Sequence, residues 1–350
     1  MMYLNEIVDK LVRLGDLLKH IQTEKNNVLA TSGDSGVLSD IILQQHALNN
    51  WQAEADITEM LLHLGNILNQ ENLSKWISAY PQIKERNKEA SPLLVKPNPN
   101  YAFAGIHEWL CCVITQTPFI LTAEHNQYQI LKFLSQKITN QDKSFASLFD
   151  ISSKNNLKPA QYVIYTEEEN NSVKHYFASK KALLIDRYNT VGIITGNETS
   201  DDLTNFGKDI FMHLGQSSRS LRKLFIPEGY DIKQFILALE PYSKVYQNNK
   251  YANNYDYHQS VFLMNKIPFL DNGFLIFKED HSNSAPTGCL YYEYYTSISA
   301  VLQKIQDSEG IENIICGEEL PVKTVKPGNS HFHNLWEYTN RKDLVDFLLK

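Results

Sequence analysis

The chain has 350 residues, of which 43% are hydrophobic, and this length predicts two domains with sizeable cores. Its formal net charge is −7, and an acidic chain without a basic stripe is a poor match for nucleic acid or a membrane surface. Two of its four cysteines are adjacent inside an apolar run, so we expect reduced thiols and a cytoplasmic protein. The opening segment MMYLNEIVDKLVRLG predicts an amphipathic helix and no signal peptide, and no apolar run approaches a membrane span.

Helical spacing of apolar residues dominates about the first 80 positions. From Pro92 onward, short apolar strands alternate with helices, which is typical of a parallel, doubly wound sheet. In this part we predict strands at Leu93–Val95, Pro118–Thr122 and Gln161–Thr166, and helices at Ala104–Thr115 and Tyr128–Ile138.

The alternation continues to the end of the chain. We predict strands at Ala182–Ile185, Thr190–Thr195, Leu224–Ile226, Phe274–Phe277, Leu290–Tyr295 and Ile311–Ile315. Helices are predicted over Asp201–Leu214, with Ser200 as a suitable cap, then from Ile232, over Ile298–Ile305 and over Asp343–Leu349. The polar segment Gln247–Tyr257 (QNNKYANNYDY) has no periodicity, and its many tyrosines predict an ordered loop rather than a disordered linker.

Common cofactor and catalytic motifs are absent from the sequence. There is no Gly-x-Gly-x-x-Gly, Walker loop, Cys-x-x-Cys or His-Glu-x-x-His. His331 and His333 have no cysteine or carboxylate beside them at ligand spacing, so we interpret them as polar surface. The turn GQSSRSL is not a hydrolase elbow, because Arg219 follows where that elbow needs glycine. Composition and spacing therefore predict a two-domain α/β protein and no specific chemistry.

One long segment nevertheless resembles a known family. The run NKYANNYDYHQSVFLMNKIPFLDNGFLIFKED, Asn249–Asp280, resembles the acyl-CoA reductases related to the LuxC fatty-acid reductase of luminous bacteria, above all their short branch in Bacteroidetes. The segments VGIITGNET, KLFIPEGYD and LYYEYY agree, and the resemblance is loose only before Leu93. It implies the aldehyde dehydrogenase-like fold, with two doubly wound α/β domains and a cleft between them. The implied division is an N-terminal helical segment at 1–90, a nucleotide-binding-type domain at 91–189, a catalytic-type domain at 190–330 and a C-terminal tail and helix at 331–350.

The resemblance also implies a chemistry. In that family a cysteine thiolate attacks an acyl thioester, and NAD(P)H then reduces the enzyme-bound acyl group to an aldehyde. Cysteine suits this role because its thiolate is a good nucleophile near neutral pH and a good leaving group. The family turn Gly-x-Gly-Cys-Arg corresponds here to Gly215, Gln216, Ser217, Ser218 and Arg219, so a serine, Ser218, stands at the cysteine position. Asn100 matches the family asparagine that donates to the oxyanion in the wider fold.

The implied cofactor positions depart from the family pattern as well. Thr122 is aligned with a lysine that holds the cofactor ribose. A family strand that ends in Ala-Thr-Gly-Ser ends here in Tyr165-Thr166-Glu167-Glu168. The resemblance thus implies NADP or NAD at Thr122, Thr166 and Glu167, but carboxylates beside a pyrophosphate are repulsive and predict weak binding.

Two functions from different classes remain open. The first is an acyl-CoA reductase impaired by Ser218 and by the altered cofactor motifs, and the second is a non-catalytic, pseudoenzyme paralogue. The paralogue binds an acyl thioester (acyl-CoA or acyl carrier protein) or a partner subunit in a homo- or hetero-oligomer. A slow thioesterase is a minor third, since the sequence supplies no base for Ser218. We expect Ser218 on a turn facing the interdomain cleft, and the four cysteines as buried packing residues.

Overall fold

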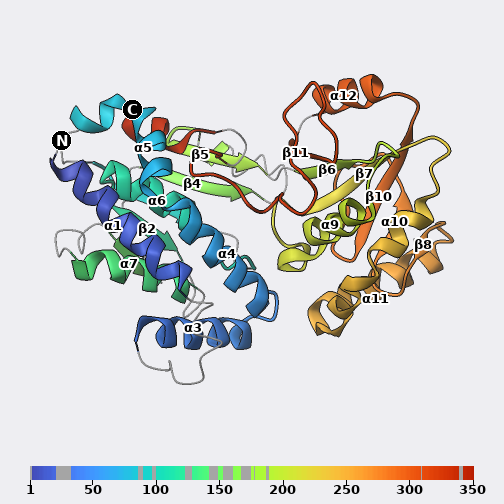
Figure 1. The fold of residues 1–350 in the computed structure, drawn as a ribbon, viewed down its shortest axis with the longest axis horizontal. Helices are drawn as coiled ribbons and strands as arrows, with labels where there is room; N and C mark the ends of the chain where they lie inside the picture. The colour runs from blue at the N-terminus through green and yellow to red at the C-terminus, as the bar shows by residue number, and fades with distance from the viewer. Residues whose placement is uncertain are drawn as a thin grey trace. The chain divides into compact units, whose positions relative to one another are not determined.

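The computed structural model describes residues 2–20, 33–85, 90–96, 100–122, 128–141, 149–152, 161–166, 175–176, 178–186, 189–308, 310–338 and 342–350 (Figure 1). Contacts divide the chain into two compact units. Unit 1 comprises Met1–Asp186 together with Asn334–Lys350, and unit 2 comprises Arg187–His333. The C-terminal segment therefore returns to the first unit.

Unit 1 is built on a five-stranded parallel sheet with the order β3-β2-β1-β4-β5. Its strands are β1 (Leu93–Lys96), β2 (Phe119–Thr122), β3 (Phe149–Ser152), β4 (Gln161–Thr166) and β5 (Lys181–Asp186). The short edge strand β3 was not predicted from the sequence. Because β1 pairs with both β2 and β4, the strand order reverses at β1, and such a point is where doubly wound sheets bind ligands.

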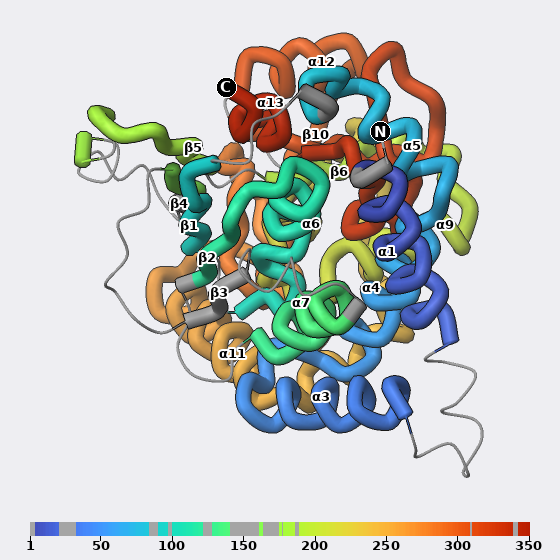
Figure 2. The backbone as a smooth tube through the Cα atoms, turned by 90° about the vertical axis from the view of Figure 1, so that its left-hand side faces the viewer, coloured from blue at the N-terminus to red at the C-terminus, as the bar shows by residue number. Residues whose placement is uncertain are grey.

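The helices of unit 1 precede the sheet, alternate with its strands or follow it in the sequence. They are α1 (Met2–Lys19), α3 (Asp34–Leu48), α4 (Glu54–Ile67), α5 (Gln70–Ser78), η1 (Pro81–Glu85), α6 (Ile106–Thr115), α7 (Gln129–Gln141) and α13 (Leu344–Leu349). Helix α1 packs against α4, α5, α6 and α7 (Figure 2). Its crossing with α4 is close because both helices have glycine there: a Cβ on Gly15 would lie 2.4 Å from the Leu68 carbonyl oxygen.

Polar aromatic contacts attach the C-terminal segment to unit 1. Trp76 Nε1 donates to Tyr338 Oη at 2.7 Å, and Tyr80 Oη donates to Asp343 Oδ2 at 2.6 Å. His107 Nε2 lies 2.8 Å from the carbonyl oxygen of Leu335. These bonds satisfy polar groups that would otherwise be buried without partners, so they stabilise the C-terminal segment in one position on unit 1.

Unit 2 is built on a six-stranded sheet with the order β11-β6-β7-β10-β9-β8, parallel except for the pairing of β8 with β9. The strands are β6 (Asn189–Ile193), β7 (Leu221–Pro227), β8 (Leu270–Asp271), β9 (Ile276–Glu279), β10 (Cys289–Tyr295) and β11 (Ile311–Cys316). Its helices are α9 (Ser200–Phe211), η3 (Met212–Gly215), α10 (Ile232–Ala238), η4 (Glu240–Gln247), α11 (Asn249–Met264) and α12 (Ile298–Asp307).

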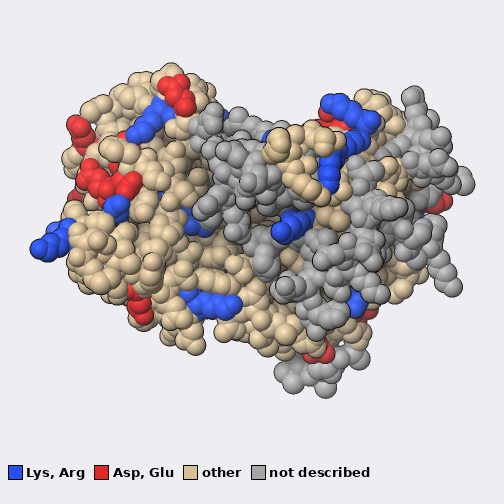
Figure 3. Space-filling view, turned by 180° about the vertical axis from the view of Figure 1, so that it is seen from behind, with Lys and Arg blue, Asp and Glu red and all other residues tan. Residues whose placement is uncertain are grey.

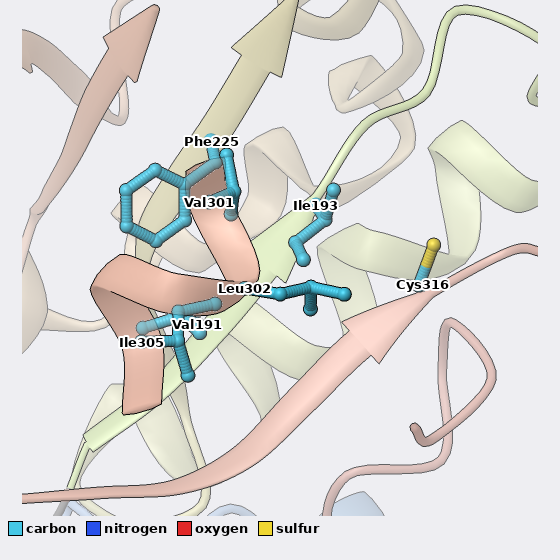
Figure 4. Packing of buried hydrophobic residues seen from close by; sticks show 7 residues of the cluster. All are labelled: Val191, Ile193, Phe225, Val301, Leu302, Ile305 and Cys316. Atoms are coloured by element: carbon cyan, nitrogen blue, oxygen red, sulfur yellow. The ribbon is translucent and has the colours of Figure 1, made fainter. Parts of the chain in front are cut away.

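Helices α9 and α12 cover opposite faces of the sheet of unit 2. The strand residues that each helix contacts show this, since successive side chains of a strand point to opposite faces. Phe225 packs with Val301 and Ile305 of α12 in a buried cluster (Figure 4). Gly192, by contrast, lies under Phe206 of α9, which would be 3.0 Å from a Cβ there. The predicted α/β organisation with parallel sheets is therefore confirmed.

The segment Gln247–Tyr257 is not the predicted loop, because most of it forms the first part of α11. Asn248 caps this helix, and its side chain accepts from the Lys250 and Tyr251 amides. Tyr251 and Tyr255, one turn apart, form the buried face. Their hydroxyls donate to the Phe274 carbonyl at 2.9 Å and to Asp271 at 2.7 Å. Tyrosine can bury its ring while its hydroxyl stays bonded, so a polar-looking sequence makes a packed helix.

The predicted cap of α9 is displaced by one residue. Thr199, not Ser200, accepts from the Asp202 amide at 3.1 Å, and Asp202 accepts from the Thr199 amide at 3.1 Å. This reciprocal pair is a capping box, which satisfies two amides where a single serine cap would satisfy one.

Within the described residues, no helix has the length and apolar content that crossing a bilayer requires. One face of the molecule carries its charged side chains in small separate groups of both signs (Figure 3).

Candidate functional site at the Ser218 turn

The chain reverses direction between α9 and β7 through a short left-handed stretch. Helix α9 ends at Phe211 rather than at Leu214 as predicted. His213 and Leu214 have φ values of 56° and 52°, and Gly215 follows with φ 71°. The left-handed conformation costs a residue with a side chain about 1–2 kcal/mol, so the surrounding contacts must hold it. The helix predicted from periodicity therefore ends three residues early, because tertiary contacts described below hold the left-handed backbone against the local helical propensity.

A tight turn over residues 217–220 follows, immediately before β7. The Ser220 amide donates to the Ser217 carbonyl at 3.1 Å, and Ser217 Oγ accepts from the Arg219 amide at 3.1 Å. Ser217 and Ser220 are buried, whereas Ser218, at the second position of the turn, is half-buried. The turn therefore exposes Ser218 and encloses the serines on either side of it.

Three side chains anchor this turn to other elements of unit 2. Gln216 Nε2 donates to Thr287 Oγ1 at 2.9 Å. The Arg222 guanidinium donates to the Ala285 carbonyl at 2.7 Å and also to the Gly215 carbonyl. Arg219 lies 3.2 Å from Glu312 of β11, and the two side chains are 11% and 5% exposed. Arg219, predicted as a site residue, thus forms a buried ion pair that fixes the backbone next to Ser218.

The described residues provide neither a base nor a thiolate at Ser218. No hydrogen bond to its hydroxyl comes from the part of the chain that the structure describes. Cys289 and Cys316, the cysteines of unit 2, are buried. Burial raises the pKa of Cys289 to about 12 and also raises the pKa of Cys316. Cys111 and Cys112 in α6 are buried too, so the predicted burial of all four cysteines is confirmed.

A buried polar cluster that the sequence did not reveal lies beside the turn. The Asp209 carboxylate accepts from the Gly328 amide at 2.6 Å and from the Ser330 amide at 2.9 Å. Burial raises the pKa of Asp209 to about 6. His331 is 1% exposed, so its interpretation as polar surface is wrong. The His331 ring lies 5.3 Å from the His213 ring, and burial lowers the pKa of His331 to about 3.

This cluster explains how the left-handed stretch is held. Residues 328–331 run along α9, where Asp209 binds their amides, and His331 then packs against His213. An aspartate on the buried face of an amphipathic helix is the sequence signal for such a contact, since a buried carboxylate needs donors. The amides that Asp209 binds, those of Gly328 and Ser330, lie about 120 residues further along the chain, and no sequence pattern marks them as its partners.

The other predicted site residues belong to unit 1. Asn100 lies in the loop before α6, and Thr122 and Thr166 are the last residues of β2 and β4. Since β2 and β4 flank β1 in a parallel sheet, both threonines reach the same carboxyl edge. Glu167 lies outside the described residues. Lys96, not singled out from the sequence, ends β1 between them and is exposed. The expectation that Ser218 faces an interdomain cleft stays a prediction.

Comparisons with known proteins identify the fold. No protein-family model matches the sequence, and no curated protein matches it. An aldehyde dehydrogenase from Brucella melitensis biovar abortus 2308 is similar in structure, with a TM-score of 0.61 and 10% identity over 91% of this chain and 73% of that chain. An oxidoreductase from Marinobacter aquaeolei has a TM-score of 0.60 and 11% identity, over 89% of this chain and 73% of that chain. Aldehyde dehydrogenase 21 from Physcomitrella patens has a TM-score of 0.57 and 8% identity, over 89% of this chain and 72% of that chain. The chain therefore has the predicted aldehyde dehydrogenase-like α/β fold.

Proposed function

We propose that this protein binds an acyl thioester at the Ser218 turn and is an acyl-CoA reductase-type protein whose reduction step is impaired. The observation that carries the proposal is the turn itself. Three anchored side chains and a left-handed stretch hold it at the start of β7, and it exposes Ser218. Strained backbone of this kind is concentrated at functional sites, where it fixes a reacting group in place.

The chemistry of a hydroxyl accounts for the impairment. A serine hydroxyl is scarcely ionised at neutral pH and needs an adjacent base, and none of the described residues hydrogen-bonds Ser218. An oxygen ester is also a poorer hydride acceptor than a thioester. Nor do Cys289 and Cys316 supply the nucleophile, because both are buried and their thiol pKa values are raised. The same lack of a base argues against the thioesterase alternative.

The cofactor side supports the same conclusion. NADH or NADPH supplies a hydride in this class of reaction. At the carboxyl edge of the sheet of unit 1, Lys96 offers one cation, and Thr122 and Thr166 are the neighbouring strand ends. Three glutamates follow Thr166 in the sequence, beginning at Glu167. One lysine does not offset three carboxylates near a pyrophosphate, so we expect weak nucleotide binding.

A partner-binding paralogue is the second candidate. Large apolar side chains are exposed at the end of α11 and on the edge strand β8, namely Leu263, Met264 and Leu270. An exposed strand edge with apolar neighbours favours association with another chain. Such a protein would assemble with a second copy or with another subunit and would need no nucleophile.

The test measures catalysis and acylation separately. We expect the purified protein to show no acyl-CoA-dependent oxidation of NADH or NADPH above background. Ser218→Cys should form a covalent thioester with an acyl-CoA, seen by intact-protein mass spectrometry and mapped to position 218 by peptide analysis. In that step the introduced thiolate attacks the thioester carbonyl, and the thiolate of coenzyme A leaves and takes up a proton. Ser218→Ala is the control and should show no adduct at that position.

Each outcome discriminates between the candidates. Robust oxidation by the unmodified protein would refute the impairment, and restored turnover in Ser218→Cys would show that the cofactor site is intact. An adduct without turnover supports the proposal. Absence of any adduct would refute a thioester site at this turn and favour the partner-binding candidate.

A further inference from the structure

The sequence just beyond the end of α9 suits a longer helix than the one observed. Leu214 continues the apolar spacing of Phe206 and Ile210, which lie on the buried face of α9. In the structure, however, His213 and Leu214 are left-handed. Each residue with a side chain disfavours that conformation by roughly 5- to 30-fold. The local sequence therefore favours a helix through Leu214, and another part of the chain must hold the backbone that is observed.

One carbonyl group of α9 shows how the longer helix is prevented. His331 Nε2 lies 3.4 Å from the backbone oxygen of Asp209, and since a carbonyl only accepts, the histidine donates. In a continued helix this same oxygen would accept from the His213 amide, because an α-helix pairs each carbonyl with the amide four residues later. The His331 ring also packs against the His213 ring, at 5.3 Å between centroids. His331 thus stands where the next helical hydrogen bond would form.

The segment that carries His331 is itself held by the last turns of α9. The Asp209 carboxylate accepts from the Gly328 amide at 2.6 Å and from the Ser330 amide at 2.9 Å. The same residue of α9 therefore binds residues 328–331 through its side chain and is capped by them through its carbonyl. Binding of this segment and continuation of the helix exclude each other.

We infer that the end of α9 is a two-state switch controlled by residues 328–331, and that this switch regulates the Ser218 turn. With the segment bound, the left-handed stretch forms and the turn is anchored as observed. With the segment released, the Asp209 carbonyl accepts from the His213 amide, α9 continues through Leu214, and the turn loses its position. Only the consequence for reactivity at Ser218 rests on the proposed function.

Reciprocal coupling provides the first test, because a change at α9 must alter how residues 328–331 are held if the two are linked. Gly215→Ala disfavours the left-handed backbone at φ 71°, and its methyl group meets the Ile210 carbonyl only at 3.4 Å. Native-state hydrogen exchange by mass spectrometry should then be roughly fivefold faster in peptides covering 328–331. Gly229→Ala is the matched control: Gly229 has φ 83°, an exposed position in unit 2 and no described neighbour within 4 Å of an added Cβ. It should leave that exchange unchanged.

His331→Ala tests the switch at its other side. In the Ser218→Cys background it should slow acylation by acetyl-CoA, the thioester exchange described above, by roughly fivefold. Adding Leu214→Gly should restore most of the rate, because glycine adopts φ 52° freely and disfavours the helix. Leu214→Ala loses nearly the same packing but keeps the left-handed cost, so it should restore nothing. Leu214→Gly should also slow exchange at 328–331 relative to Leu214→Ala, which decides the question if Gly215→Ala does not fold.

The outcomes separate this inference from the proposed function. Equal exchange at 328–331 in Gly215→Ala and Gly229→Ala would overturn the inference while the thioester site stands. Equal behaviour of Leu214→Gly and Leu214→Ala would overturn it too. Faster exchange in Gly215→Ala without any adduct in Ser218→Cys would support the two states of α9 and refute the proposed function.

Discussion

Glu293 is at the centre of a charge network in unit 2 in which Lys223 is fully buried, and we predict that Glu293→Gln destabilises this unit by about 3 kcal/mol at pH 7. Lys223 of β7, with its side chain 0% exposed, donates to Glu293 Oε2 at 2.9 Å and to the Asp280 carbonyl. Lys304 of α12 donates to Oε1, and His281 Nδ1 lies 3.2 Å from Oε2. The glutamine keeps the shape of the side chain but leaves the Lys223 charge without its counter-ion.

The magnitude follows from two independent routes. Removing one partner of a buried ion pair costs about 3–5 kcal/mol, because the other charge stays buried and uncompensated. Burial alone raises the pKa of Glu293, but the hydrogen bonds from Lys304 and Lys223 outweigh it and lower that pKa from 4.5 to about 2. At about 1.4 kcal/mol for each pH unit, this shift corresponds to roughly 3 kcal/mol. The Lys304 side chain is 40% exposed, so solvent screens its share of this shift, and roughly 3 kcal/mol is the upper value.

The sign of the pKa shift determines how the effect depends on pH. The folded-state pKa of Glu293 is lowered, so its contribution to stability is complete above the unfolded-state value of 4.5. That contribution is lost as the pH falls from 4.5 toward about 2. The difference between the parent protein and Glu293→Gln should therefore be constant from pH 7 down to about 5 and shrink below it.

Native-state hydrogen exchange by mass spectrometry measures this locally, from peptides of β7 and β10. Glu279→Gln is the matched control, because Glu279 is exposed at the end of the neighbouring strand β9 and should change stability by less than about 0.5 kcal/mol. Lys223→Met combined with Glu293→Leu should recover most of the loss, since it removes both charges. A loss below about 1 kcal/mol at pH 7, or one that persists undiminished at pH 3, would contradict this prediction.

Two further predictions concern unit 1. Gly15→Ala should lower its stability by about 1–3 kcal/mol, because the added methyl meets the Leu68 carbonyl at 2.4 Å. Urea unfolding followed by tryptophan fluorescence checks this, since all four tryptophans lie in unit 1, and an unchanged unfolding midpoint would contradict it. Calorimetry with NADH and NADPH should detect only weak binding, because glutamates follow Thr166; a dissociation constant in the low micromolar range would show that another binding mode compensates.

Local patterns in the sequence were sufficient for most of the architecture. Strands such as Leu93–Val95 and Gln161–Thr166 are short apolar runs, and helices such as Ile298–Ile305 repeat apolar residues at helical spacing; both signals come from neighbours along the chain. Their alternation predicted parallel sheets because successive parallel strands need a crossover helix. Burial of Cys111 and Cys112 also followed from the apolar run around them.

The features that position the Ser218 turn depend on contacts between residues far apart in the chain. Asp209 finds its donors at Gly328 and Ser330, and Tyr251 finds its acceptor at Phe274, so neither contact leaves a periodic signal. Such contacts buried His331, ended α9 at Phe211 and turned a polar segment into α11. A buried polar group takes its partner from whichever distant segment the fold brings within bonding distance, and local periodicity does not encode that distance.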